Sequence, residues 1–356
     1  MDAAPQKPTR PKRGLARAVR QRAIAAVTHT GLALARWLPA RGVDAIEAAI
    51  AASGPYMPVL ARMVADNMRA AGVYSRDAVR AYFVGLAAHF AGAMHVWRVP
   101  DPGESGAPVP ASMRDFLIRR VALDPSLDPL IDRSRRGHGA VLVGPHLSGY
   151  LIYLARLNLD LPLTAYMRPT RHEKRRALQE RWMRTVGLRR LVDPDSNANP
   201  TLVMASAVKR GGVVYITPDL PRKLDDGTPV RFLGREIYLP AGLSLISRRA
   251  GAPMYFLTAR LDGGVCRLGA IGPYEAPAGE PRGERGQAAM QWFADLFARF
   301  LCDNPGMWYF WADKRWTRVL RGDPEYSRTL PPVSGDVDSL ARDASATRPL
   351  TNESHA

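Results

Sequence analysis

Residues 141–157 read VLVGPHLSGYLIYLARL. The opening apolar run is typical of a buried strand, and the residues after the Ser148-Gly149 turn have the apolar spacing of a helix. A strand that passes through a short turn into a helix is the building block of an α/β fold. The turn also carries His146 at the carboxyl end of the strand, where open α/β sheets bind their ligands. This stretch therefore predicts both a fold class and a candidate site.

The rest of the chain continues the alternation of strands and helices. Strands are predicted at 140–144, 162–166, 189–192, 212–216 and 253–261, and helices at 113–134, 148–157, 171–186, 199–209, 240–251 and 285–302. Such alternation favours a mostly parallel sheet with helices on its faces. The predicted fold class is α/β, with a mostly parallel or mixed central sheet flanked by helices and preceded by a helical region.

Composition shifts along the chain suggest four parts. They are a basic flexible N-terminus at 1–22, a helical region at 23–110, an α/β domain at 111–322 and a disordered polar tail at 323–356. The Pro/Gly/Ser-rich loop near residues 100–112 separates the second part from the third. An apolar segment that begins near residue 23 is interrupted by His29, Arg36 and Pro39 before it reaches the ~20 apolar residues that a bilayer span needs.

The charge balance predicts an anionic partner. The chain has 50 Lys and Arg against 33 Asp and Glu, a formal net charge of +17. Phospholipid, an acidic carrier protein and nucleic acid all fit that charge. The chain lacks helix-turn-helix, zinc-finger and aromatic RNA-binding signatures, so we expect no nucleic-acid partner. Cys266 and Cys302 have no metal-site spacing, and we expect neither a metal nor a resident cofactor.

Three positions could carry chemistry, and each also has a plainer explanation. His146 could be a general base, because imidazole accepts protons near neutral pH, or an ordinary loop histidine. Arg168 follows an apolar strand pattern and lies in the segment 166–190, which contains nine Arg and Lys residues. These basic residues could hold phosphates or form a solvated helix face. Asp219 ends another strand and could line a site or simply form a turn. Ser148 lacks the G-x-S-x-G context of a serine nucleophile.

Taken in order, the blocks of this chain resemble the late acyltransferases of lipid A biosynthesis, within the lysophospholipid acyltransferase superfamily. The resemblance runs from about residue 60 to 320, and no single block is specific. The blocks are VLVGPHLSGY, YMRP with Arg184-Thr-Val-Gly187, RGGVVYITPD, VRFLGREIYLPAGLSLISRRAGAPMYF and NPGMWYFWADKRWTRV.

The resemblance implies transfer of an acyl chain from an acyl-carrier-protein or coenzyme A thioester to a hydroxyl on a glycolipid. For this chain we expect the acceptor to be a hydroxyl or amine of a lipid, glycolipid or other small molecule. His146 takes the place of the family's general base. Arg168, Arg184 and Asp219 fall at positions associated with substrate binding or site architecture. Ser148 and Gly149 of the histidine turn are assigned to substrate binding as well. The expected location is the cytoplasmic face of the inner membrane, as a peripheral protein, or the cytoplasm.

The sequence departs from the family pattern at one position. The family places Asp or Glu five residues after the histidine to orient its ring, and this chain has Leu151 there. Three explanations remain open. Another carboxylate such as Asp219 could serve from elsewhere in the fold, or the acceptor could be an amine that needs less assistance. Alternatively, the chain could be an inactive relative that binds lipid without transferring acyl groups.

Overall fold

The computed structural model describes residues 35–103, 108–165, 173–190, 199–262, 264–275 and 284–330. The predictions made for residues 1–22, for Arg168 and for the tail beyond residue 330 lie outside these described residues.

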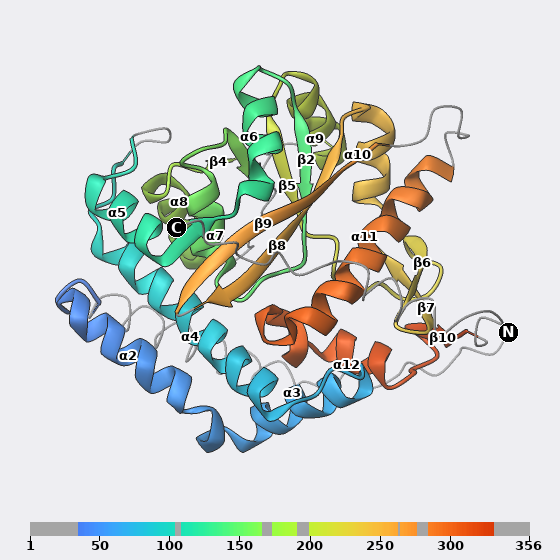
Figure 1. Ribbon diagram of the computed structural model, residues 1–356, viewed down its shortest axis with the longest axis horizontal. Coiled ribbons are helices and arrows are strands. Elements are labelled where there is room, and N and C mark those ends of the chain that lie inside the picture. Colours follow the sequence, from blue (N-terminus) through green and yellow to red (C-terminus); the bar gives the residue numbers. More distant parts are fainter. Residues whose placement is uncertain are drawn as a thin grey trace, which may run out of the picture.

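A seven-stranded sheet forms the centre of the molecule, with the strand order β1-β9-β8-β2-β5-β3-β4 (Figure 1). Neighbouring strands are parallel except for β8 and β9, which form an antiparallel pair. The sheet is therefore mixed and mostly parallel, which confirms the predicted fold class. The strands are β1 (Val121–Leu123), β2 (Ala140–Val143), β3 (Leu163–Ala165), β4 (Arg189–Arg190), β5 (Val213–Ile216), β8 (Met254–Asp262) and β9 (Val265–Tyr274).

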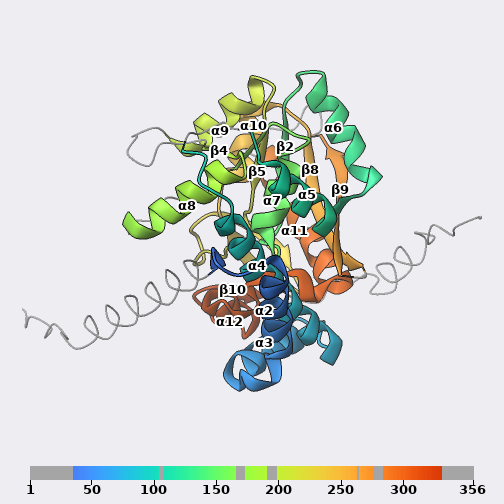
Figure 2. The same cartoon turned by 90° about the vertical axis from the view of Figure 1, so that its left-hand side faces the viewer.

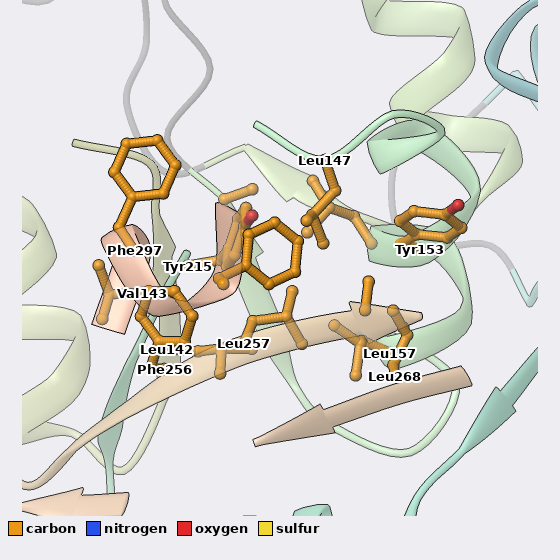
Figure 3. Close-up of a cluster of buried hydrophobic side chains, with 14 of the residues drawn as sticks. Leu142, Val143, Leu147, Tyr153, Leu157, Tyr215, Phe256, Leu257, Leu268 and Phe297 are labelled. Carbon is orange, nitrogen blue, oxygen red and sulfur yellow. The ribbon is translucent and has the colours of Figure 1, made fainter. Parts of the chain in front are cut away.

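The central strand β2 is apolar at every position because both of its faces are covered. All four of its residues are buried, as expected for a strand that has helices on both sides. Leu142 and Val143 pack with Phe256 of β8 and with Phe297 of a long helix, in the cluster that Figure 3 shows. The covering helices are α5 (Ala111–Arg120), α6 (Asp128–Arg135), α7 (Tyr150–Leu157), α8 (Glu173–Thr185), α9 (Pro200–Lys209), α10 (Gly242–Ala250) and α11 (Glu284–Asp303).

Two predictions about element boundaries are wrong. The helix expected at 113–134 is two helices, α5 and α6, separated by the short strand β1, which pairs with β9. Disorder was predicted to begin at residue 323, which is too early, because β10 (Ser327–Thr329) pairs with β7 (Arg235–Leu239). Together with β6 (Thr228–Phe232), these strands form a separate three-stranded antiparallel sheet.

The N-terminal region is helical from the point where the description begins. It contains α2 (Ala40–Ala52), the 3-10 turn η1 (Gly54–Tyr56), α3 (Pro58–Ala70) and α4 (Arg76–Arg98). These helices lie at the lower end of the sheet in Figures 1 and 2, opposite α6, α9 and α10. Within the described ranges, no helix has the length and apolar character needed to cross a bilayer.

The C-terminal segment packs between the N-terminal helices and the central sheet. It consists of the turns η3 (Pro305–Met307) and η4 (Tyr309–Ala312) and the helix α12 (Lys314–Leu320). Trp308, Trp311 and Trp316 of this segment are fully buried. Asn67 of α3 donates from Nδ2 to the carbonyl oxygen of Trp311 at 2.7 Å. This bond joins the N-terminal helices to the segment that contacts the candidate site.

Candidate active site

His146 and Asp219 meet at the carboxyl edge of the central sheet. β2 and β5 are adjacent parallel strands, and their register pairs Val143 with Ile216. His146 and Asp219 each lie three residues beyond these last paired residues, so both loops leave the sheet at the same level. This edge is where α/β sheets place their ligands.

The carboxylate of Asp219 binds His146 at two points. The backbone N–H of His146 donates to Oδ2 at 2.8 Å, and the ring atom Nδ1 lies 2.5 Å from Oδ1. Asp219 is fully buried, whereas the His146 side chain is 20% exposed. A carboxylate that holds one ring nitrogen leaves the other available for proton transfer, which is the arrangement of a base with its orienting acid.

Two tryptophans fix Asp219. The indole N–H of Trp308 donates to Oδ2 at 2.9 Å, and that of Trp316 donates to the Asp219 carbonyl oxygen at 2.8 Å. The two rings pack edge to face with centroids 5.0 Å apart. Because these donors are buried and rigid, Asp219 has little freedom to turn away from His146.

The second ring nitrogen of His146 contacts a hydroxyl group. Thr217 Oγ1 lies 3.2 Å from Nε2. In the tautomer that carries its proton on Nδ1, Nε2 has a lone pair that can accept the threonine hydroxyl proton. The hydroxyl of Thr217 thus shows where an acceptor hydroxyl would approach the base.

Aromatic rings surround the imidazole of His146. The Phe310 ring lies 4.5 Å from it and the Tyr150 ring 6.0 Å, measured between centroids. His89 of α4 packs against Tyr150 with centroids 5.0 Å apart. Burial lowers the pKa of His89 to about 4, so His89 is neutral at physiological pH and adds no charge beside the base.

An apolar cavity of about 310 Å³ lies between α4, α7 and α8. Tyr150, whose ring neighbours those of both His146 and His89, is part of the cavity wall and separates the cavity from the imidazole by one side chain. Leu151 lines it at the position where the family pattern has an acid. The cavity is lined by Ala93, Val96, Trp97, Tyr150, Leu151, Leu178, Gln179 and Trp182. Its size is at the lower end of the ~300–1,000 Å³ typical of small-molecule pockets.

The other residues assigned to substrate binding have structural partners. Arg184 donates from Nε to Asp101 Oδ1 at 3.1 Å and from Nη2 to Asp101 Oδ2 at 2.7 Å, and this lowers the pKa of Asp101 to about 2. Ser148 is fully buried, and a Cβ added to Gly85 of α4 would lie 2.6 Å from its Cβ. Gly149 precedes α7 with φ of 86°, a conformation that favours glycine. Ser148 and Gly149 therefore shape the histidine turn.

Sequence reasoning missed Thr217, Trp308 and Trp316. Thr217 directly follows β5 and stands two residues before Asp219, so the same strand-end argument could have found it. The tryptophans lie about 90 residues further along, and no local pattern links them to either β2 or β5. They become visible only when the chain has folded.

Comparison with known families supplies an independent finding. Residues 119–318 match the family described as bacterial lipid A biosynthesis acyltransferases. This match covers more than half of the chain and includes both His146 and Asp219. No curated protein matches the chain.

Proposed function

Because the chain belongs to the bacterial lipid A biosynthesis acyltransferase family, we propose that it moves an acyl chain from a thioester to a hydroxyl or amine, with His146 as general base and Asp219 as its orienting acid. The donor is an acyl-carrier-protein or coenzyme A thioester, and the acceptor is a lipid, glycolipid or other small molecule. The observation that supports this proposal best is the 2.5 Å contact between His146 Nδ1 and Asp219 Oδ1.

The proposed reaction uses His146 twice. Nε2 removes the proton of the acceptor hydroxyl or amine as its oxygen or nitrogen attacks the thioester carbonyl carbon. The tetrahedral intermediate then collapses, the carbon–sulfur bond breaks, and the imidazolium returns its proton to the departing thiolate. Asp219 keeps Nδ1 protonated throughout and stabilises the positive charge that the ring carries between the two steps.

The replacement of the family acid by leucine fits the same scheme. Asp219 already occupies Nδ1, so a second carboxylate at position 151 would have no free ring nitrogen to orient. A leucine at that position instead extends the apolar cavity, and we assign the cavity to the acyl chain of the substrate. Of the three explanations for Leu151, this geometry favours a carboxylate supplied from elsewhere in the fold.

Phosphate binding by Arg168 and Arg184 rests on the family resemblance. In the structure Arg184 forms a two-point ion pair with Asp101. To hold a substrate phosphate, Arg184 would have to bind the phosphate and Asp101 together, or give up its bonds to Asp101.

Thiol release from long-chain acyl-CoA and acyl-carrier-protein, in the presence of a cell lipid extract, tests the proposal. Mass spectrometry of the extract then identifies the acylated product. We expect His146→Ala to abolish thiol release and product formation. His138→Ala, at an exposed histidine just before β2, is the matched control and should leave both unchanged. Transfer that persists in the His146→Ala variant would disprove the assignment of the base.

The second candidate is a lipid-binding relative without activity, which was suggested by Leu151. It predicts that lipid binds while thioester consumption stays at background. The complete His146–Asp219 pair argues against it, because an idle imidazole needs no buried carboxylate held by two indoles.

A further inference from the structure

The junction of α2 and α3 exposes three apolar side chains within four residues. Tyr56 is 86% exposed, Val59 is 82% exposed and Met57 is 42% exposed. We call these three residues the apolar tip. The junction lies at the end of the molecule opposite α6 and α9, in the lower part of both Figure 1 and Figure 2. Scattered exposed apolar residues are ordinary, but a cluster at a protruding corner marks an interaction surface.

The backbone holds the apolar tip in place. Gly54 lies so close to Phe83 of α4 that an added Cβ would come within 2.8 Å of the ring. Pro58 begins α3, where its fixed φ suits the first helical turn. Asn67, about two turns after Val59 on α3, donates to the carbonyl oxygen of Trp311. The exposure of the apolar tip is therefore a property of the folded structure.

A positively charged hollow lies between α3 and the start of α4, and its first lining residue, Ala61, follows the apolar tip by two residues. Its volume is about 490 Å³, and it is lined by Ala61, Arg62, Ala65, Asp66, Arg69, Tyr74, Arg76 and Val79. Three arginines against one aspartate leave two positive charges. We call this the arginine hollow. Within the part of the chain that the structure describes, Arg62 and Arg76 have no carboxylate at ion-pair distance, whereas Arg69 binds Asp66 at 2.8 Å.

Val59 of the apolar tip and two arginines of the arginine hollow lie on one side of α3. Val59 and Arg62 are three residues apart on α3, and Arg69 follows two turns later, so all three project from the same side. Apolar and aromatic side chains enter the interfacial region of a bilayer, while basic side chains beside them bind the phosphates of anionic lipids. The two features together match one chemistry, that of an anionic phospholipid surface.

We propose that the apolar tip and the arginine hollow form a membrane-docking surface, with Tyr56, Met57 and Val59 entering the headgroup region and Arg62 and Arg76 contacting lipid phosphates. An acidic protein would fit the arginine hollow but would leave the exposed Tyr56 and Val59 without a role. The choice of a membrane therefore rests on the two features being adjacent.

This docking surface is joined to the candidate active site through side chains. Asn67 links α3 to Trp311, whose ring packs against Trp308 with centroids 4.8 Å apart. Trp308 in turn donates to Asp219. Docking through α3 would thus fix the orientation of the catalytic edge toward the membrane from which a lipid acceptor would come.

Site-specific fluorescence on the full chain tests the proposal. Cys302 is exposed and Cys266 is buried, so a Cys302→Ser background allows Val59→Cys to be labelled with an environment-sensitive nitrobenzoxadiazole dye. Leu202→Cys on α9, at an exposed leucine in the opposite end of the molecule, is the matched control. We expect a blue-shifted, stronger emission at position 59, but not at 202, on adding phosphatidylglycerol vesicles at low salt. Phosphatidylcholine vesicles should give no response.

Charge and insertion are then tested separately by co-sedimentation with the same vesicles. Tyr56→Ser with Val59→Ser should lower vesicle affinity by roughly tenfold, because the apolar contact is lost. Arg62→Gln should lower it by about fivefold, and Arg136→Gln at the far end of the molecule should not. His146→Ala should bind vesicles like the native chain, so failure of docking and failure of catalysis are distinguishable.

Four results would overturn the docking surface. Co-sedimentation without any emission change at position 59 would show that the membrane is reached through other residues. An equal response to neutral vesicles would remove the arginine hollow from the mechanism. Blue-shifted emission before vesicles are added would show that the apolar tip is already covered by another segment or by a second copy of the chain. A response to acyl-carrier-protein but to no vesicle would identify a protein partner.

Discussion

Asp219 lies opposite His146 because each residue follows the last paired residue of its strand by three positions. The strands are β2 and β5, which are adjacent and parallel. The acid thus comes from a loop 73 residues further along the chain than the histidine.

The first prediction concerns this pair. Asp219→Asn preserves the shape of the side chain but favours the wrong imidazole tautomer. We expect kcat to fall by about 10³–10⁴-fold, as loss of an orienting carboxylate does in catalytic triads. Initial rates of thiol release measure this, and a loss below tenfold would contradict the role of Asp219.

Leu151→Asp restores the acid of the family pattern at its usual position. We expect no gain in activity, because Nδ1 is already bound to Asp219 and the new carboxylate enters an apolar cavity wall. The free energy of unfolding should fall by about 1–2 kcal/mol, measured by urea denaturation at pH 7. Activity restored by Leu151→Asp in an Asp219→Asn background would show that position 151 can still reach the imidazole.

Thr217→Val removes the hydroxyl that contacts Nε2 while keeping the shape of the side chain. Direct transfer to the acceptor requires Nε2 itself, so we expect kcat to change by less than about tenfold, the effect of one ordinary hydrogen bond. Intact-mass spectrometry of the native protein incubated with acyl thioester alone supplies the control, with no acyl adduct expected. An adduct that disappears in Thr217→Val would instead identify Thr217 as a covalent nucleophile.

Ala93→Phe fills part of the 310 Å³ cavity without touching His146. We expect kcat/KM to fall more steeply for long acyl chains than for short ones, because a longer chain needs the space that the new ring occupies. A series of saturated acyl-CoA donors gives this comparison within one variant. A uniform loss across all chain lengths would argue that the cavity does not hold the acyl chain.

His89→Phe tests the neutral state of the buried imidazole. Burial lowers the pKa of His89 from 6.5 to about 4, so the folded state resists a proton that the unfolded chain accepts. Above pH 6.5 His89 is neutral in both states and does not affect the free energy of unfolding. As the pH falls toward 4, the unfolded chain takes up a proton that the folded chain does not, and the free energy of unfolding falls by about 3 kcal/mol in all. The difference between the free energies of unfolding at pH 7 and pH 4 should therefore be smaller in His89→Phe. If this difference is the same in His89→Phe as in the native chain, the lowered pKa of His89 is contradicted.

The sequence predicted the strand, turn and helix around His146 because that unit is local. A buried apolar run, a Ser-Gly turn and a helical pattern lie within 17 residues, and each follows from short-range preferences. The same reasoning located the end of β5 and therefore Asp219 as a strand-end carboxylate. Both halves of the candidate pair were thus predicted separately.

Their contact could be raised only as one of three open explanations for Leu151, because it depends on the order of strands in the sheet. β3 and β4 follow β2 along the chain, yet β5 returns to lie between β2 and β3. Hydrophobic periodicity reports which segments are strands but carries no information on which strands become neighbours. The error over 113–134 has a related origin, since the short strand β1 exists only through its pairing with β9.

The two tryptophans that hold Asp219 in place affect how related chains can be found by sequence patterns. Trp308 and Trp316 hold the carboxylate in place from a segment far from the histidine loop. The position five residues after the histidine is then free to vary, and here it has become part of an apolar wall. A search pattern that demands histidine and acid in one short window would reject this chain, whereas a pattern that joins the histidine loop to the β5 end and to both indoles would retain it.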